Sequence, residues 1–462
     1  MYSDFMNEYI SLGHMTRIEN YGDSHYFLPH HGVFREDSST TKLRVVFNAS
    51  QKTSSGKSLN DIQMVGQALQ NDLISILLRF RQYKYVICAD IEKMFRQILI
   101  QPDQLNLQLV LWRNDSSEAL SVYQLNTVTY GTASAPFLSI RCVRQLGLQC
   151  ADEHISRVIL EDFFVDDLIT GSDSKSELFD TCKKISDICL SGCFHLRKWT
   201  SNMPDIVPKE VQNNQTSKRL SLDDSISSKT LGIGWYHHSD QLHFTSKFKT
   251  FKGKVTKRII LSLVSQIYDP LGLLSPFIIL GKILLQNLWV CKVGWDDEIP
   301  QDILVKWNNF ISNLSYLHNI KIPRYVINAD YNHLELHIFT DASQVAYGAC
   351  AYIRSCSDNG DVTCRLLCSK SRVAPLKPVT IPRLELCGAL IGARLVHKII
   401  TSLRLTFDKI VLWTDSTIVL GWLKMPPNQL KAFVQNRIVE INDLTCNATW
   451  KHVITKMMSV RT

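Results

Sequence analysis

Two adjacent carboxylates, Asp166 and Asp167, interrupt the apolar run FFVDDLITGS at residues 163–172. Neighbouring carboxylates repel each other, and burying either one is costly unless a positive charge lies beside it. Two interpretations remain open. The pair can lie at the solvated tip of a β-hairpin, where aspartate is a common turn residue, or it can bind a metal ion. Taken alone the pair favours the hairpin tip, so other acids in the chain have to decide.

The composition is that of an ordinary globular protein. The 462 residues are 45% apolar and 20% charged, and the length predicts two to four domains. The formal net charge of +8 suits a polyanionic partner such as nucleic acid. The charge is weak support by itself, because many basic proteins bind no polyanion.

The thirteen cysteines indicate reduced thiols in an intracellular protein. The chain has no Cys-x-x-Cys pair, and the closest spacings, Cys189/Cys193 and Cys364/Cys368, lack paired histidines that would complete a zinc site. The N-terminus MYSDFMNEYI lacks the basic-then-apolar pattern of a signal peptide. We therefore expect an intracellular, cytoplasmic location.

The most apolar stretch, residues 273–290, is broken by Pro276 and Lys282. A buried helix is therefore expected there and not a membrane span.

Periodicity predicts a mixture of helices and strands. In the first half we expect helices over 68–82 and 134–148, and strands over 83–90, 105–112 and 121–131, the last two as a hairpin. Residues 201–230, rich in Ser, Asn, Asp and Lys, form the predicted linker, and 255–330 are mostly helical in pattern. The last part predicts strands over 333–343 and 407–416 and a helix over 382–403.

The predicted elements place three acids of the first half at strand ends and turns. Asp90 ends one apolar strand, and Asp166 and Asp167 lie between two others. Such ends can converge in one sheet, and Mg²⁺ bound through carboxylates and substrate phosphates would offset the repulsion. Pairs of such ions serve phosphoryl transfer in polymerases and nucleases. Three unrelated surface acids are the alternative.

The second half repeats the pattern with other spacings. Asp341 and Asp415 each end a predicted strand, and Glu385 lies near the start of a predicted helix. Two strand-end acids and one helical acid again suit a two-metal site. Glu385 by itself is weak support, because acids favour the first turn of any helix.

Several motifs occur in the order found in reverse transcriptases: KLRVVFNAS, CADIEKMFRQI, TYGTASAPFL, FFVDDL, FHLRKWTSN and LGIGW. With YFLPHHGV, SQIYDPLGLLSP and WDDEIP they resemble the polymerase region of Pao/BEL-type LTR retrotransposons. FTDASQVAYGACAY, IPRLELCGALIGARL and LWTDS resemble the ribonuclease H segment that follows in those polyproteins. The resemblance covers about residues 20–455.

The resemblance implies that Asp90, Asp166 and Asp167 hold two magnesium ions, which manganese can replace. It implies that Phe95 presses on the sugar of the incoming nucleotide and selects dNTPs over rNTPs, although core packing would equally explain this ring.

Further residues correspond to motif positions of the family. Arg44 matches a position that contacts the triphosphate, where a planar guanidinium suits phosphate oxygens. Lys198 matches a lysine suggested to protonate pyrophosphate. Gly131–Pro136 matches the segment beneath the template base, and Trp235 resembles the primer-grip region or is plain core.

This sequence also departs from the family. Phe164 stands where Tyr is usual, and Asn48 where Asp is expected. After TWKHV at 449–453 the family continues into a stretch with a fourth ribonuclease H acid. Here ITKMMSVRT contains no acid, and Arg461 falls near the missing position. A three-acid site with a nearby Arg would bind metal less well, so we expect weak or absent ribonuclease H activity.

The expected fold is α/β (α+β) in the form of a right hand. Fingers and palm span 1–200, a helical thumb or connection spans 201–330, and a C-terminally incomplete ribonuclease H-like α/β domain spans 331–462. No aspartic-protease or integrase motif is present, so we expect a fragment of the element's polyprotein or a degenerate copy.

The expected function is that of an RNA-directed DNA polymerase acting on an RNA/DNA primer-template with dNTPs, with Mg²⁺ at Asp90, Asp166 and Asp167 and again at Asp341, Glu385 and Asp415. The alternative is a catalytically inactive nucleic-acid-binding remnant. The oligomeric state is not predicted.

Overall fold

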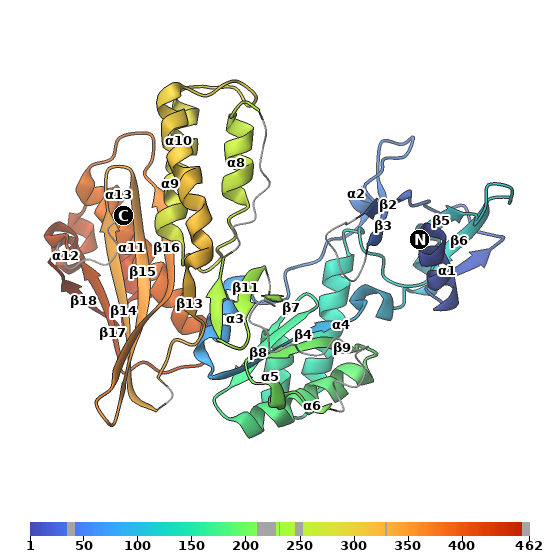
Figure 1. The fold of residues 1–462 in the computed structure, drawn as a ribbon, viewed down its shortest axis with the longest axis horizontal. Helices are drawn as coiled ribbons and strands as arrows, with labels where there is room; N and C mark the ends of the chain where they lie inside the picture. Colours follow the sequence, from blue (N-terminus) through green and yellow to red (C-terminus); the bar gives the residue numbers. More distant parts are fainter. Residues whose placement is uncertain (35–41, 210–227, 231, 245–252, 329, 455–462) are drawn as a thin grey trace.

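The computed structural model describes residues 1–34, 42–209, 228–230, 232–244, 253–328 and 330–454. The molecule is elongated, with the N-terminal part at one end, a five-stranded sheet at the other, and the helices of residues 257–314 projecting upward beside that sheet (Figure 1). Within the described residues, every helix is too short or too polar to cross a membrane.

The N-terminal part contains a three-stranded sheet of order β1-β6-β5 and a separate hairpin, β2-β3. Its elements are α1 (Tyr2–Ser11), β1 (Met15–Ile18), β2 (His30–Phe34), β3 (Leu43–Phe47), α2 (Leu59–Ile62), β5 (Leu109–Trp112) and β6 (Ser121–Leu125). Apolar residues of α1, the strands and α2 form one core, which includes Met6, Phe47 and Val110.

The hairpin expected over 105–112 and 121–131 is shorter than predicted. Residues Pro102–Leu107 form a 3₁₀ helix, and β5 begins at Leu109. Pro102 sets the first turn of that 3₁₀ helix, so the Leu alternation there does not mark a strand. The partner strand β6 ends at Leu125 and pairs with β5 in antiparallel register.

The next part is built on a four-stranded antiparallel sheet of order β7-β8-β4-β9. Its elements are α3 (Leu73–Gln82), β4 (Tyr85–Ile91), α4 (Ala135–Gln149), α5 (Glu153–Glu161), β7 (Phe163–Phe164), β8 (Asp167–Ser172), α6 (Lys175–Ser191) and β9 (Leu196–Ser201). The expected strand and helix here are found at β4 and α4. Helices α4, α5 and α6 pack together on this sheet around a second core.

Helix α3 begins at Leu73 and not at residue 68. The reason is a capping contact, because the Asp72 side chain accepts a hydrogen bond from the backbone N–H of Ser75 at 2.9 Å. An N-cap of this kind fixes where a helix starts more strongly than the apolar spacing upstream does.

The middle part joins a small antiparallel sheet of order β10-β11-β12-β13 to three helices. Its elements are β10 (Ser228–Thr230), β11 (Ile233–Tyr236), β12 (Gln241–His243), α8 (Lys257–Ser265), α9 (Ser275–Val290), α10 (Gln301–Leu314) and β13 (Lys321–Pro323). The helical prediction for 255–330 holds for these three helices. Most of the predicted linker, residues 210–227, lies outside the described residues.

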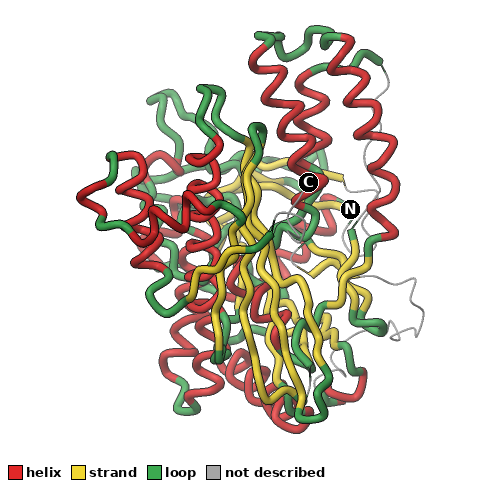
Figure 2. The backbone as a smooth tube through the Cα atoms, turned by 90° about the vertical axis from the view of Figure 1, so that its left-hand side faces the viewer, coloured by secondary structure: helices red, strands yellow, loops and turns green. Residues whose placement is uncertain are grey.

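The C-terminal part is a five-stranded sheet of order β16-β15-β14-β17-β18, in which β14, β17 and β18 run parallel. Its elements are β14 (Tyr331–Ala342), β15 (Ala346–Ser357), β16 (Val362–Val373), α11 (Ile381–Ser402), β17 (Lys409–Thr414), α12 (Thr417–Lys424), α13 (Ala432–Leu444) and β18 (Thr449–His452). From the left-hand side of Figure 1 the long strands run as one layer, with helices beside it (Figure 2). The strands and the helix predicted for this part are all found.

The largest apolar core joins parts that are far apart in the sequence. It includes residues of α3, of the helices α8–α10 and of the C-terminal sheet, such as Leu77, Leu284 and Leu336. Two fully buried arginines also join these parts. Arg81 donates to the carbonyls of Pro323, Arg324 and Leu367, and Arg324 donates to those of Phe80, Tyr83 and Lys84.

Candidate metal centres

The first set of acids converges on the sheet that contains β4 and β8. Asp90 of β4 is the direct antiparallel partner of Asp167 of β8, and Asp166 lies in the turn between β7 and β8. Side chains of directly opposed residues on one face lie about 5 Å apart at Cβ. The backbone N–H of Ile91 donates to the Asp166 carbonyl at 2.8 Å, which ties the turn to β4.

The turn itself is strained and held from outside. Val165 adopts φ +57°, a region that β-branched residues rarely occupy. Its N–H donates to the side-chain oxygen of Gln70 at 3.0 Å. Below the turn, Phe163 pairs with the fully buried Leu168. The apolar residues on either side of the acids therefore anchor the hairpin, and the two carboxylates remain at its half-buried tip.

Electrostatics at this set follow from burial and from one cation. Burial, with the charges of Asp166 and Asp90, raises the pKa of Asp167 to about 6. Burial also raises the pKa of Asp90, while Lys198, whose Nζ lies 3.2 Å from Asp90 Oδ2, acts to lower it. Strands β4 and β8 therefore hold two half-buried, mutually repelling carboxylates, Asp90 and Asp167, beside one lysine.

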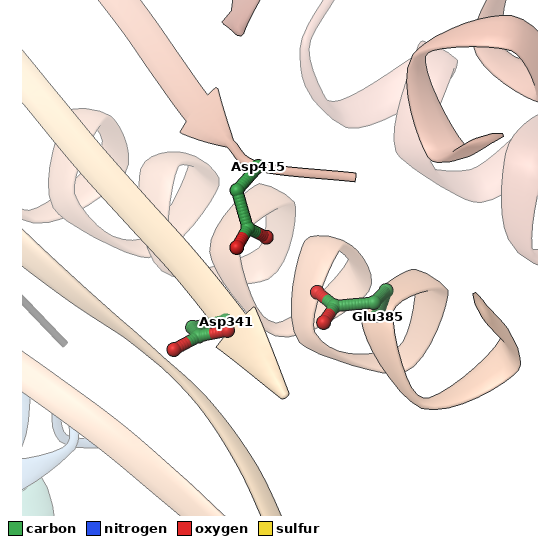
Figure 3. A group of neighbouring side chains, drawn as sticks. All are labelled: Asp341, Glu385 and Asp415. Carbon is green, nitrogen blue, oxygen red and sulfur yellow. The ribbon is translucent and has the colours of Figure 1, made fainter. Parts of the chain in front are cut away.

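The second set of acids is more compact. Among the described residues, Asp341, Glu385 and Asp415 form the group of three acids whose ligand oxygens all lie within 4.8 Å of one another. Asp341 ends β14, Asp415 follows the neighbouring parallel strand β17, and Glu385 lies in the first turns of α11. Their carboxylates face one another (Figure 3).

Two glycines let α11 lie close enough to the sheet to bring Glu385 into this group. A Cβ at Gly388 would lie 3.0 Å from the Asp341 carbonyl oxygen, and one at Gly392 would lie 2.5 Å from Cγ2 of Thr340. Such contacts leave no room for a larger residue, so the small side chains set the separation of helix and strand. Glu385 is therefore positioned by Gly388 and Gly392, which lie one and two turns further along α11.

Glu385 is the most buried acid of the set, with 7% of its surface exposed. Burial, together with the charges of Asp341 and Asp415, raises its pKa to about 8. Its Oε2 atom is buried without a hydrogen-bond partner, and such an atom is costly unless something positive satisfies it. Three hard oxygen donors and one orphaned oxygen fit a divalent cation such as Mg²⁺.

The strand β18 ends near this group, since His452 pairs with Thr414 next to Asp415. The sequence lacks the family's fourth ribonuclease H acid, whose position would lie just beyond this point and near Arg461. Residues 455–462 lie outside the described residues, so the structure does not place Arg461.

The other predicted site residues lie in several different elements. Phe95 is half-buried in a 3₁₀ helix, Met94–Gln97, that follows β4, and Lys198 lies beside Asp90. Arg44 is exposed on β3, in a different sheet from the acids. Gly131 has φ +101°, and a Cβ there would lie 2.3 Å from the carbonyl oxygen of Phe47.

Trp235 is core. Its side chain is completely buried, packs edge-on against Phe80, and donates to Asp240 at 3.0 Å. It therefore has no surface with which to contact nucleic acid.

Sequence reasoning missed a buried ionic group beneath the first set, formed by Arg79, Glu161, Asp162 and Arg404. Asp162 is fully buried, four residues before Asp166. An available signal was Arg79, which lies on the apolar side of an amphipathic helix. Arg404 gave no such signal, because it comes from a loop far along the chain.

The domain-family match covers the second acid set, and the structural matches cover nearly the whole chain. Residues 256–416 match the domain family described as Pao retrotransposon-like RNaseH-like domain. This segment begins at the cap of α8 and contains all three acids of the second set. No curated protein matches the sequence.

Three solved structures of the foamy viral protease-reverse transcriptase share the fold. The form designated dRH in complex with double-stranded DNA has a TM-score of 0.62 and 16% identity, covering 97% of this chain and 68% of that chain. The complex with an RNA/DNA hybrid has a TM-score of 0.61 and 15% identity, covering 99% and 54%. Another complex with double-stranded DNA has a TM-score of 0.56 and 16% identity, covering 98% and 82%.

The expected fold class is therefore confirmed: the chain combines helices and sheets in the arrangement of a reverse transcriptase with an RNase H-like region. Together, the domain matched over residues 256–416 and this fold support the resemblance to Pao/BEL-type retroelement polyproteins.

Proposed function

We propose that the chain is an RNA-directed DNA polymerase that extends a primer on an RNA or DNA template. One observation carries the proposal: Asp90 and Asp167 are direct partners across two strands, with Asp166 in the adjoining turn and Lys198 beside Asp90. Three acids at one sheet end, next to a cation, suit nucleotidyl transfer with divalent metals.

In this proposal Asp90, Asp166 and Asp167 hold two Mg²⁺ ions, which Mn²⁺ can replace. The bound ions would make the primer hydroxyl more acidic and neutralise charge on the phosphates. Lys198 Nζ lies 3.2 Å from Asp90 Oδ2, and in this proposal Lys198 would donate a proton to the departing pyrophosphate oxygen. Arg44, exposed on β3, would contact the triphosphate.

Phe95 is proposed to select the sugar. It belongs to the short 3₁₀ helix that follows the strand of Asp90, and its ring is half-buried. A ring fixed there would exclude a 2′-hydroxyl, so that dNTPs are used in preference to rNTPs. Phe95→Ala should then raise ribonucleotide incorporation relative to deoxyribonucleotide incorporation.

The partner is proposed to be a primer-template duplex. The foamy viral proteins of the same fold are described in complexes with double-stranded DNA and with an RNA/DNA hybrid. The net charge of +8 supports phosphate contacts, and binding should therefore weaken as salt is added.

A second activity, hydrolysis of the RNA strand of a hybrid, is supported by the compact group of Asp341, Glu385 and Asp415. These residues would hold Mg²⁺, and the orphaned oxygen of Glu385 fits that role. Residues 453–462 contain no acid, and Arg461 falls near the position of the family's fourth acid, so we propose that this activity is weak.

Primer extension tests the main proposal. The purified chain should extend a DNA primer on poly(rA) with Mg²⁺ or Mn²⁺, and Asp166→Asn should reduce the rate by about 10³-fold or more, as for loss of a catalytic metal ligand. Extension by Asp166→Asn at the wild-type rate would refute the polymerase assignment.

The same experiment separates the rival, a catalytically inactive nucleic-acid-binding remnant. Binding to the primer-template that survives EDTA, with no extension at any metal concentration, would support the remnant. Glu440→Gln, an exposed change on α13 outside both acid sets, serves as the control and should leave extension unchanged.

A further inference from the structure

A buried ionic group joins the hairpin of the first acid set to the C-terminal domain. Asp162 is completely buried between α5 and β7. Its Oδ1 accepts from Arg79 Nε at 2.8 Å and from Arg404 Nη2 at 3.0 Å. Its Oδ2 accepts from Arg404 Nη1 at 3.1 Å and from the Thr170 hydroxyl at 2.8 Å.

Asp162 is also part of the hairpin that presents the acids. Its carbonyl accepts from the backbone N–H of Ile169 at 3.0 Å, and Thr170 belongs to β8, the strand that begins with Asp167. Any displacement of Asp162 is therefore passed to the base of the turn that holds Asp166 and Asp167.

Arg404 comes from the other domain. It follows α11, the helix whose first turns contain Glu385. Besides its two-pronged contact with Asp162, it donates to Glu161 Oε2 at 2.8 Å and to the Tyr83 hydroxyl at 3.3 Å, and its backbone N–H donates to Gln82 at 2.9 Å. The planar guanidinium therefore fixes both the position and the orientation of the Asp162 carboxylate.

Helix α3 closes the connection from a third side. Arg79 donates to the carbonyl of Ser402, the last residue of α11, at 3.2 Å, and the hydroxyls of Ser75 and Ser402 lie 2.9 Å apart. Two arginines and two acids balance in charge, so breaking one partner leaves a buried charge uncompensated. The contact therefore joins the two domains through a charge-balanced group.

We propose that Arg404 is a positioning residue for the polymerase site: through Asp162 it fixes the Asp166–Asp167 hairpin relative to the helix that holds Glu385. The inference rests on the proposed function and extends it, because a residue of the C-terminal domain then controls the geometry of the first metal site.

The test compares Arg404→Leu with a matched control, Arg394→Leu. Arg394 also lies on the C-terminal side, in α11, and also makes a two-pronged contact with a carboxylate, Glu440, at 2.6 and 3.0 Å. That pair joins α11 to α13 within one domain. The control therefore removes the same kind of contact without touching the interface.

In primer extension on an RNA template, Arg404→Leu should lower kcat by about tenfold to a hundredfold, as expected for small misplacement of reacting groups. The KM for dNTP should stay within about twofold, because the triphosphate contacts are untouched. Arg394→Leu should change neither constant.

Hydrogen exchange provides a readout that needs no activity. The amides of Leu168 and Ile169 in β8 should exchange faster in Arg404→Leu than in wild type, and should be unchanged in Arg394→Leu. Unchanged exchange at these amides overturns the coupling whatever the kinetics, and faster exchange with unchanged kcat overturns the positioning role.

The two proposals fail in different ways. If the wild-type chain extends no primer, the polymerase assignment fails, while hydrogen exchange still decides the coupling. Should Arg404→Leu not fold, Arg404→Lys, which keeps the charge and loses the two-pronged contact, and Glu161→Gln, at the exposed edge of the group, give the same two readouts.

Discussion

The Nζ atom of Lys198 lies 3.2 Å from Oδ2 of Asp90, and it reaches that position from a distorted strand. Lys198 adopts φ +54°, and the pairing of β4 with β9 shifts register between Cys88 and Asp90. A bulge of this kind re-aims a side chain, and left-handed backbone in a residue other than glycine costs about 1 kcal/mol. The distorted strand brings a cation to a half-buried carboxylate.

Replacing Lys198 by Met should shift the pH dependence of primer extension. Burial already raises the pKa of Asp90, and Lys198 counteracts that rise. Without the cation the pKa rises further, so the acidic limb of the pH–rate profile should move to higher pH. We also expect kcat to fall by about 10²-fold, as for loss of a general acid.

Lys198→Arg is the control for this prediction, because it keeps the positive charge. It should leave the acidic limb in place. An unshifted limb in Lys198→Met would show that Lys198 does not influence the titration of Asp90.

Asp167→Asn should stabilise the metal-free protein at neutral pH. Burial raises the folded-state pKa of Asp167 to about 6, above the ordinary aspartate value of 3.8, so the folded state binds the proton more tightly than the unfolded state does. The contribution of this proton to the free energy of unfolding is complete below about pH 4 and is lost as the pH rises through 6. The variant avoids the loss and should gain about 1 kcal/mol after allowance for solvent screening.

Urea denaturation in EDTA at pH 4 and pH 8 measures this gain. The free energy of unfolding of Asp167→Asn should exceed that of wild type by more at pH 8 than at pH 4. Equal differences at the two values would contradict a raised pKa for Asp167. Asp115→Asn should show the opposite pH trend, because hydrogen bonds from Ser117 lower the pKa of that exposed carboxyl.

Mn²⁺ binding at the second acid set should release a proton. With a pKa of about 8, Glu385 is mostly protonated at pH 7 in the metal-free protein. A bound cation requires the ionised form, so affinity should increase as the pH rises from 6 to 8. Calorimetry in two buffers of different ionisation enthalpy measures the released proton.

Glu385→Gln should abolish this proton release and weaken binding by about tenfold or more, as for loss of one metal ligand. Glu440→Gln, an exposed change on α13, should leave both quantities at wild-type values. Proton release that persists in Glu385→Gln would assign the titration to another group.

Asp240→Ala should destabilise the protein strongly. Asp240 pairs with Arg324, whose side chain is completely buried and donates to three carbonyls at the end of α3 and just after it. Removing the acid leaves that cation without its counter-charge, which costs about 3–5 kcal/mol. The free energy of unfolding in urea measures the loss.

Asp296→Ala is the matched control, because it breaks the exposed two-pronged pair with Arg258. Surface pairs contribute about 1 kcal/mol or less. Similar losses in the two variants would mean that Arg324 tolerates burial without Asp240.

The sequence by itself determined the elements and the identity of the candidate acids. Periodic apolar residues predicted β4, α4, β14 and α11, since strand and helix periods are local properties of the chain. The apolar residues flanking Asp166 and Asp167 predicted a hairpin, and the structure has one. The predicted start of α3 was wrong because the Asp72 N-cap sets it at Leu73. The strand predicted from residue 105 was wrong at its start because Pro102 begins a 3₁₀ helix there.

Only the tertiary structure decided which charged groups meet. Asp90 opposes Asp167 because of the register between strands β4 and β8, and Glu385 reaches Asp341 because two glycines let α11 approach the sheet. Arg404 reaches Asp162 across 242 positions of sequence. Hydrogen-bonded ion pairs and shared metal sites need their atoms within about 3 Å of each other or of the ion, so they depend on packing that no local pattern of residues specifies.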